Sequence, residues 1–284
     1  MVAMERDYTI FNRFNFEYKP VGVKYSLSKP EGIQPLDKSL ALCELFREAQ
    51  TSKPFYVTRE NIQCGEQILG MSPFPPLMHS GSLGSMFSMF KNAQANSRIY
   101  AYIPTLSADS VKYVALASVD QMSFDPDILI VTASVSQAEI ILRASSYASG
   151  KMWNSKGSTC LACSWIFAYP YVSGEMNYTI SGLGYSMKAR GVLPEGLIII
   201  SIPSDQILPL IDNLKDMEWH PYWFDLGREG FIQEVKKRSG ELGRQLFPPA
   251  PGLLHGSLQS PTPGLAPLRE PMPKSPGASC PLLS

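Results

Sequence analysis

The sequence has few charged residues, no net charge and no long apolar run. Charged side chains make up 18% of the 284 residues, and 25 basic residues balance 25 acidic ones. A chain without net charge has no global field that attracts nucleic acid or an anionic membrane. No apolar stretch reaches the roughly 18 residues that mark a transmembrane helix, and no signal peptide is visible. We therefore expect a cytoplasmic protein with no nucleic acid and no membrane among its partners.

Familiar catalytic motifs are also missing. The sequence contains no Gly-x-Ser-x-Gly elbow, no phosphate-binding loop and no His-Glu-x-x-His motif. His79 and His220 belong to no motif with a nucleophile. The segment Gly182–Leu–Gly184 lacks the third glycine of a dinucleotide fingerprint. No reaction class can be assigned from these motifs.

What the chain does contain is enough apolar sequence, 44%, for a core. Apolar runs at 128–133 and 196–202 predict buried strands, each followed by a helix that serine caps. These two similar units are candidates for pseudo-equivalent halves of an α+β fold, with a mixed sheet and packed helices. We expect a single domain over residues 1–245. Ten prolines without periodicity predict a disordered tail over residues 246–284.

Four cysteines lie in the expected domain, where a reducing cytosol would leave them as free or metal-bound thiols. Cys43 falls in the middle of the apolar face of a helix predicted from Pro35 to Gln50. Cys64 falls in a helix predicted to follow Thr58 and to end at Gly70. Both positions are also typical of ordinary buried cysteines.

Cys160 and Cys163 form a Cys-x-x-Cys pair at the predicted start of a further helix, which we expect to continue to about Pro170. A thiol in the first turn of a helix has a lowered pKa, because unpaired N–H groups and the helix dipole stabilise the thiolate. Cys160 is therefore a candidate thiolate. The segment before the pair has no strand signal, which a thioredoxin-like motif would require.

Three interpretations of these thiols stay open. In the leading one, a cysteine-lined cleft holds zinc, an iron–sulfur cluster or another thiol-ligated cofactor, with Cys43, Cys64, Cys160 and Cys163 as candidate ligands. Three ligands would leave one position for a substrate. In the second, Cys160 is the redox or nucleophilic thiolate of an enzyme. In the third, all the thiols are inert and buried in a structural or interaction protein.

A small-molecule or cofactor ligand is the partner class that these residues suggest. Gly184, Lys188 and Arg190 are candidate cofactor-binding residues, because a glycine turn followed by two cations can present N–H groups and positive charge to an anion. An ordinary turn between strands explains the same residues more simply.

Five short motifs occur in a characteristic order. They are Pro20–Val–Gly–Val–Lys24 ahead of the Cys43 helix, Cys64–Gly65 ahead of Leu69–Gly70, the Thr159–Cys160 helix, the segment 182–190 and the strand ending in Ile198–Ile–Ile–Ser–Ile–Pro203. Together they resemble the family called domain of unknown function 169, over about residues 14–240 and without the tail. The resemblance implies a cytosolic protein without an established activity. It implies site positions at Cys43, Cys64 and Cys160, and does not extend to Cys163.

Overall fold

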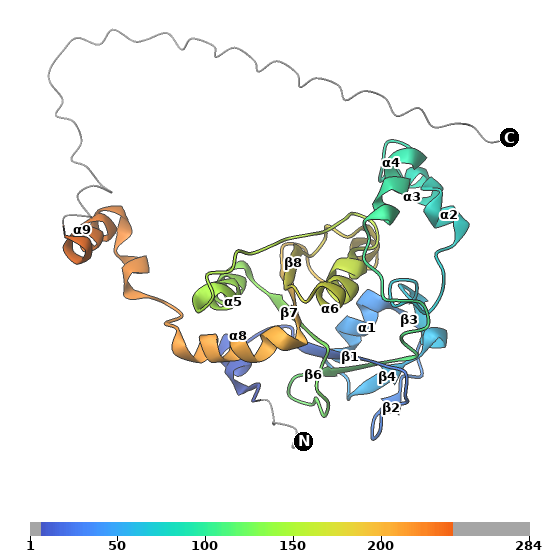
Figure 1. Ribbon diagram of the computed structural model, residues 1–284, viewed down its shortest axis with the longest axis horizontal. Helices are drawn as coiled ribbons and strands as arrows, with labels where there is room; N and C mark the ends of the chain where they lie inside the picture. Colours follow the sequence, from blue (N-terminus) through green and yellow to red (C-terminus); the bar gives the residue numbers. More distant parts are fainter. Residues whose placement is uncertain (1–6, 241–284) are drawn as a thin grey trace, which may run out of the picture. The chain divides into compact units, whose positions relative to one another are not determined.

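The computed structural model describes residues 7–240, and its main unit is built on one mixed sheet (Figure 1). The seven strands follow the order β2-β4-β6-β1-β7-β9-β8. Strands β2 and β4 run parallel, and the other neighbours are antiparallel. The predicted α+β class with a mixed sheet is therefore confirmed. The strands are β1 (Val21–Ser26), β2 (Gln34–Pro35), β4 (Phe55–Val57), β6 (Tyr113–Ser118), β7 (Ile128–Ala133), β8 (Asn177–Ile180) and β9 (Ile198–Pro203).

The two faces of the sheet belong to different cores, which explains why its central strands are apolar without alternation. All six residues of β7 are buried. Ile128 and Ile130 pack with α1 (Leu42–Ala49), whereas Leu129 and Val131 pack with α5 (Val135–Tyr147) and α8 (Ser204–Asp216). Successive side chains of a strand point to opposite faces, so a strand covered on both sides must be apolar throughout. The short 3-10 helix η1 (Thr9–Phe14) adds its aromatic side chains to the second core.

The two similar strand–helix units lie beside one another. Strand β7 pairs with β9 along its full length, with Ile128 opposite Pro203 and Ala133 opposite Ile198. The helices that follow them, α5 and α8, are in contact. Ser134 caps α5 as expected, since its hydroxyl accepts from the Gln137 N–H at 3.3 Å. The two similar units are therefore neighbours: their strands pair within the sheet, and their helices pack side by side on the same face of it.

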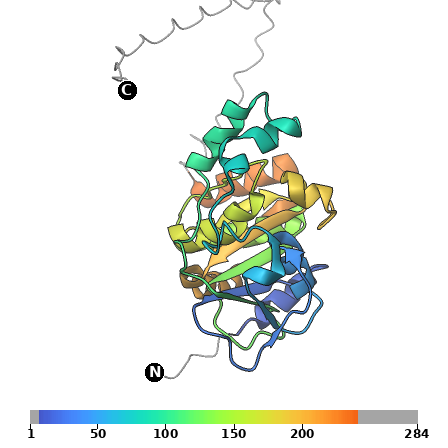
Figure 2. The same ribbon diagram turned by 90° about the vertical axis from the view of Figure 1, so that its right-hand side faces the viewer.

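A helical excursion over residues 76–101 separates β5 (Ile62–Cys64) from β6. It comprises α2 (Pro76–His79), α3 (Ser82–Met86), α4 (Ala93–Ser97) and the 3-10 helix η3 (Arg98–Ala101). Figure 2 shows these short helices in teal at one end of the main unit, beyond the sheet. Asn96, which is fully buried, ties them together by donating from Nδ2 to the Gly81 carbonyl at 2.9 Å.

A second compact unit begins at Pro221 and contains η5 (Tyr222–Asp225) and α9 (Gly227–Ser239) among the described residues. The single domain over residues 1–245 therefore stays a prediction. The predicted tail at 246–284 lies outside the described residues. Within residues 7–240, the helices are too short or too polar to span a membrane.

Candidate functional site

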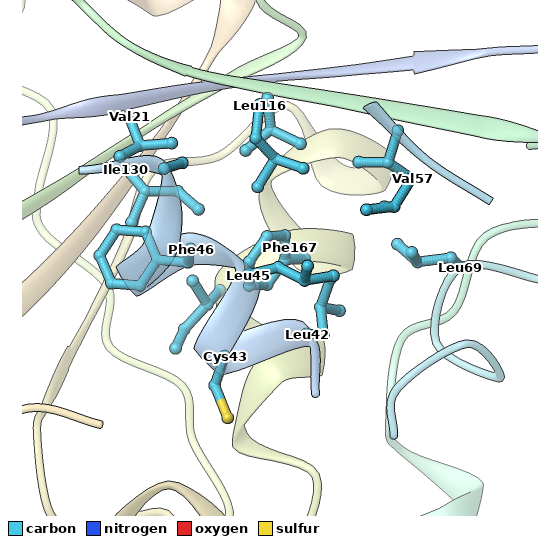
Figure 3. Packing of buried hydrophobic residues seen from close by; sticks show 14 of the residues in the cluster. Val21, Leu42, Cys43, Leu45, Phe46, Val57, Leu69, Leu116, Ile130 and Phe167 are labelled. Carbon is cyan, nitrogen blue, oxygen red and sulfur yellow. The ribbon is translucent and has the colours of Figure 1, made fainter. Parts of the chain in front are cut away.

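Cys43 lies in the first turn of α1, which begins at Leu42 and not at the predicted Pro35. The residues before it form strands instead, β2 and then β3 (Leu40–Ala41). The apolar face of α1 packs Leu42, Leu45 and Phe46 into the core, as periodicity predicts. In Figure 3, the Cys43 sulfur points away from Phe46 and from the sheet, so it leaves the centre of that core.

Cys64 ends a strand, β5 (Ile62–Cys64), whereas the sequence predicted a helix. This strand pairs in parallel with β3, and Cys64 lies opposite Ala41, the residue before α1. Gly65 then turns the chain with a φ of 105°. A Cβ at that position would meet the Cβ of Leu42 at 2.9 Å. A glycine is needed here by both backbone conformation and space, and it keeps Cys64 against the start of α1.

The Cys-x-x-Cys pair does not share a helix. Leu161 adopts a left-handed conformation with a φ of 53°, and regular helix begins only at Ala162. Cys163 is therefore in the first turn, and Cys160 precedes the helix. The helix continues as a π-helical segment, η4 (Ser164–Ala168), and then as α6 (Tyr169–Ser173). The predicted start at Cys160 was wrong because a non-glycine residue turns the chain between the two thiols.

Cys43, Cys64 and Cys163 line one cavity of about 40 Å³, which we call the thiol cavity. Most of its other lining is apolar, and a cavity of this size admits one or two water-sized molecules. The remaining lining residues are Ala41, Gly65, Ile68, Leu161, Ala162, Gly184, Ser186 and Met187. Three of the four predicted ligand positions are thus brought together from distant parts of the chain.

The thiols of the cavity are electrostatically unequal. An interaction between the side chains of Cys43 and Cys163 is the main cause of a lowered pKa at Cys43. The same interaction, together with burial, raises the pKa of Cys163 well above its usual range. Burial raises the pKa of Cys64. The arrangement favours a Cys43 thiolate held by a protonated Cys163.

The predicted anion-binding residues separate into different environments. Gly184 lines the thiol cavity, where its missing side chain allows close packing: a Cβ there would lie 2.6 Å from the Cβ of Ala162. Arg190 Nη1 lies 3.1 Å from Oε2 of Glu44, the residue that follows Cys43, and its charge helps to lower the pKa of Cys43. Lys188 instead pairs with Glu195 at 2.8 Å, with both side chains more than half exposed.

Cys160 lies among residues of the helical excursion. Its sulfur is 3.9 Å from Met89 Sδ and 3.7 Å from Asn96 Oδ1. Burial raises its pKa, so the predicted lowering was wrong. The physical reason is that Cys160 precedes the helix, so no first-turn N–H groups stabilise its thiolate.

A metal centre is not preformed. Within residues 7–240, no three His, Cys, Asp or Glu side chains are arranged to hold a metal ion. The three sulfurs share a cavity without forming a ready ligand set, which would bring all of them within about 2.3 Å of one zinc ion. Zinc and an iron–sulfur cluster therefore stay predictions.

Glu44 is a site residue that the sequence interpretation missed. Its Oε2 accepts from the Ala41 N–H at 2.8 Å, which satisfies an otherwise unpaired donor at the start of α1. Its negative charge opposes the lowering of the Cys43 pKa. A glutamate three residues after a helix cap is half of a recognised start signal, but Ala41 lacks the side-chain oxygen that would complete it.

Comparison with known proteins gives one match. A family model described as DUF169, uncharacterised ArCR, matches residues 9–213. The match covers more than half of the chain and contains all four cysteines of the main unit, together with Arg190. No curated protein and no solved structure matches the chain.

Proposed function

Because the chain belongs to the DUF169 family, which is described without an activity, we propose its function from the site: Cys43 and Cys163 are a redox-active dithiol pair. The observation that carries the proposal is that Cys43 and Cys163 line the same small cavity, where the interaction of their side chains lowers the pKa of Cys43 and raises that of Cys163. The thiolate is the nucleophilic form of cysteine. Cys43 is accordingly the attacking thiolate, and Cys163 is the thiol that resolves the intermediate.

The size of the thiol cavity indicates the class of oxidant. A cavity of about 40 Å³ beside Cys43 admits a molecule of one or two heavy atoms, such as hydrogen peroxide. A peptide disulfide is far larger. Burial also limits access, since Cys43 is only 2% exposed. We therefore assign a small hydroperoxide as the oxidant.

The oxidation proceeds in two steps. The Cys43 sulfur attacks one peroxide oxygen, the O–O bond breaks, and the leaving hydroxide takes a proton from solvent, so that Cys43 becomes a sulfenic acid. The Cys163 sulfur then attacks the Cys43 sulfur while its own proton joins the departing hydroxyl as water. The S–O bond breaks and a disulfide forms. In total, the two thiols lose two electrons, which reduce one peroxide to water.

Return to the dithiol requires two equivalents of a low-molecular-weight thiol, and because the cavity admits only one or two heavy atoms, local opening must expose the disulfide before a thiol attacks it. The first attacks the disulfide and forms a mixed disulfide, and the second displaces the protein thiol and leaves as a small disulfide. Such thiols keep the cytoplasm reducing, which is the compartment that the sequence predicts. The cycle therefore needs no cofactor.

Peptide mapping after oxidation tests this proposal. The reduced protein is treated with one equivalent of hydrogen peroxide, digested without reductant and analysed by mass spectrometry. We expect a Cys43–Cys163 disulfide in the wild type and in the matched control Cys160→Ser. In Cys163→Ser, dimedone added together with denaturant should trap a sulfenic acid on Cys43, since the folded cavity is too small for the reagent. A disulfide that forms only when Cys160 is present would contradict the proposal. Oxidation of Cys160 ahead of Cys43 would contradict it as well.

A thiol-ligated cofactor is the second candidate function. The observation that favours it is the convergence of Cys43, Cys64 and Cys163 on one cavity from α1, β5 and the helix after Leu161. Three thiolates would leave one coordination position open. Binding would require the sulfurs to move closer together, since no ligand set is preformed among residues 7–240.

Elemental analysis and an ultraviolet–visible spectrum of protein purified without oxygen separate the two functions. Stoichiometric zinc or iron that is lost in Cys64→Ser and kept in Cys160→Ser would favour the cofactor over the dithiol. Metal-free protein that forms the Cys43–Cys163 disulfide favours the dithiol. Thiols that react only in denaturant would contradict both and support an inert core.

A further inference from the structure

A second cavity lies beside the first but differs from it in size and polarity. Its volume is about 400 Å³, against about 40 Å³ for the thiol cavity. It lies between α1 and the turn after α7 (Tyr185–Ala189), and its lining includes two arginines and two glutamates. We call it the arginine cleft. It is lined by Leu40, Glu44, Arg47, Glu48, Thr51, Arg190, Gly191 and Val192.

Both carboxylates of the arginine cleft already have strong partners. Glu44 Oε2 accepts from the Ala41 N–H at 2.8 Å and lies 3.1 Å from Arg190 Nη1. Glu48 Oε1 accepts from Lys38 Nζ at 2.8 Å and from the Ser52 hydroxyl at 2.7 Å. These bonds lower the pKa of Glu48, so it is ionised at neutral pH. Neither carboxylate is left to attract a cation.

Arg47 is different, because its guanidinium has no carboxylate partner within residues 7–240. Its Nη1 donates to Gln50 Oε1 at 2.8 Å, and its carbon lies 4.6 Å from the ring centroid of Tyr18. Gln50 is 3% exposed, so this support is rigid. A guanidinium has about five N–H donors, and most of those on Arg47 remain available.

The charged side chains that line the arginine cleft balance, since Arg47 and Arg190 are matched by Glu44 and Glu48. Glu44 is paired with Arg190 and Glu48 with Lys38, so Arg47 is the cation of the lining that has no carboxylate partner among the described residues. The planar guanidinium matches the two oxygens of a carboxylate. The cleft therefore has the charge and the donors to hold one monoanion.

We propose that the arginine cleft binds a small organic monocarboxylate, with Arg47 and Arg190 holding the carboxylate and Leu40 and Val192 contacting its apolar body. The volume falls within the range of about 300–1,000 Å³ that is typical of small-molecule sites. The apolar side chains in the lining favour an organic acid over inorganic phosphate. This binding does not depend on the dithiol chemistry, because the two cavities share no lining residue.

The cleft is nevertheless coupled to the thiols through Arg190. The positive charge of Arg190 contributes to the lowered pKa of Cys43, and it opposes the rise that burial causes in the pKa of Cys64. A bound carboxylate offsets that charge, so it raises the pKa of Cys43 and makes the thiolate less abundant. Occupancy of the arginine cleft therefore slows the oxidation of Cys43. This consequence, unlike the binding itself, rests on the proposed dithiol function.

Isothermal titration calorimetry with hexanoate tests the binding, with hexanamide as the neutral isostere and inorganic phosphate as the competing anion class. We expect hexanoate to bind and hexanamide and phosphate to bind at least about tenfold more weakly, since a bidentate ion pair is worth a factor of that order. Arg47→Gln should weaken hexanoate binding by a similar factor. Arg59→Gln, at an exposed arginine outside the cleft, is the matched control and should change nothing.

Two further measurements keep the outcomes distinct. Cys43→Ser should retain hexanoate binding, because the carboxylate site does not depend on the dithiol chemistry. Circular dichroism of Arg47→Gln establishes that the variant is folded. Equal affinity for hexanoate and hexanamide, equal affinity for phosphate, or unchanged binding in folded Arg47→Gln would each overturn the proposal.

Discussion

Cys160 and Cys163 are three positions apart in the sequence and occupy opposite kinds of environment. Cys163 lines an apolar cavity together with Cys43, and its interaction with Cys43 raises its own pKa. Cys160 lies against Met89 and Asn96 of the helical excursion, with no second cysteine among its partners within residues 7–240. Cys163 therefore has a neighbouring cysteine, Cys43, with which it can form a disulfide, and Cys160 has none among the described residues. A spacing motif therefore predicts proximity only if the backbone within the motif stays regular.

The cause of the difference is Leu161. Its φ of 53° lies in the left-handed region, which non-glycine residues seldom adopt. In a continuous helix, residues three positions apart lie on the same face, and the two cysteines would have faced one cavity together. The left-handed turn places Cys160 outside that helix instead.

The largest contrast between the two regions is expected in stability. Leu42→Ala, next to Cys43, removes a fully buried side chain from the core and should lower the free energy of unfolding by about 2–5 kcal/mol. Leu77→Ala, in α2 of the excursion, removes a side chain that is 51% exposed and should change it by less than about 0.5 kcal/mol. Urea denaturation measures both. Similar losses would show that the excursion is as tightly packed as the α1 region.

A pair of glycine substitutions should cost similar stability in the two regions and separate the regions by thiol chemistry. In Gly184→Ala, the new Cβ would lie 2.6 Å from that of Ala162, so the thiol cavity must distort. In Gly84→Ala, it would lie 2.4 Å from Nδ2 of Asn96, the partner of Cys160. Overpacking typically costs about 1–3 kcal/mol, and we expect both variants to lose stability in this range.

The two glycine variants differ in what happens to the thiols. Gly184→Ala displaces the helix start that carries Cys163, so it should slow formation of the Cys43–Cys163 disulfide. Gly84→Ala should leave that rate unchanged. Rates are followed by quenching with an alkylating reagent after addition of hydrogen peroxide. A slower rate in Gly84→Ala would mean that the excursion controls the thiol cavity, and the comparison would fail.

The sheet could be predicted from sequence and the cysteine geometry could not. Apolar runs identified β7 and β9, because a strand buried on both faces has a strong local signal. The signals around Cys43 and Cys64 were weaker: strands of two or three residues, β3 and β5, replaced parts of the expected helices. Short strands form through pairing with each other, which no local pattern reveals.

The sequence predicted which cysteines belong to the site better than it predicted what each of them does there. Cys43, Cys64 and Cys163 do converge, but the sequence pointed to Cys160 as the thiolate because its position looked like a helix start. Nothing in the residues around Leu161 predicts a left-handed turn. Cys43 and Cys163 are far apart in the sequence, so only tertiary folding could bring them to the same cavity.

Replacing Cys163 should shift the pKa of Cys43 by removing the side chain whose interaction lowers it. Cys163→Ala should raise that pKa, whereas Cys163→Ser keeps a hydroxyl donor and should raise it less. The thiolate absorbance in the far ultraviolet, measured against Cys43→Ser, reports the titration. The same replacements of Cys160 should leave the Cys43 pKa unchanged. An equal shift for Ala and Ser would show that burial, and not the interaction with a donor at position 163, sets the pKa.

The lowered pKa also predicts how stability depends on pH. A thiol whose folded-state pKa is below its unfolded value of 9.0 binds fewer protons when folded, so folding is favoured as the pH rises between those two values. The free energy of unfolding of the wild type, relative to Cys43→Ser, should therefore increase with pH across this window and be lost below it. The free energy of unfolding of the wild type relative to Cys160→Ser should show no such increase, since the folded-state pKa of Cys160 is raised.

The smallest effects distinguish the two cations that the sequence grouped together. Lys188 and Glu195 form an exposed ion pair, with side chains 57% and 67% exposed, and such pairs contribute little to stability. Lys188→Gln should therefore leave both the unfolding midpoint and the Cys43 pKa unchanged. Arg190→Gln should raise the Cys43 pKa slightly, because Arg190 is a minor cause of its lowering. If Lys188→Gln also raised the Cys43 pKa, the positive field at the thiol cavity would come from the whole segment after Gly184, and the division between Lys188 and Arg190 would not hold.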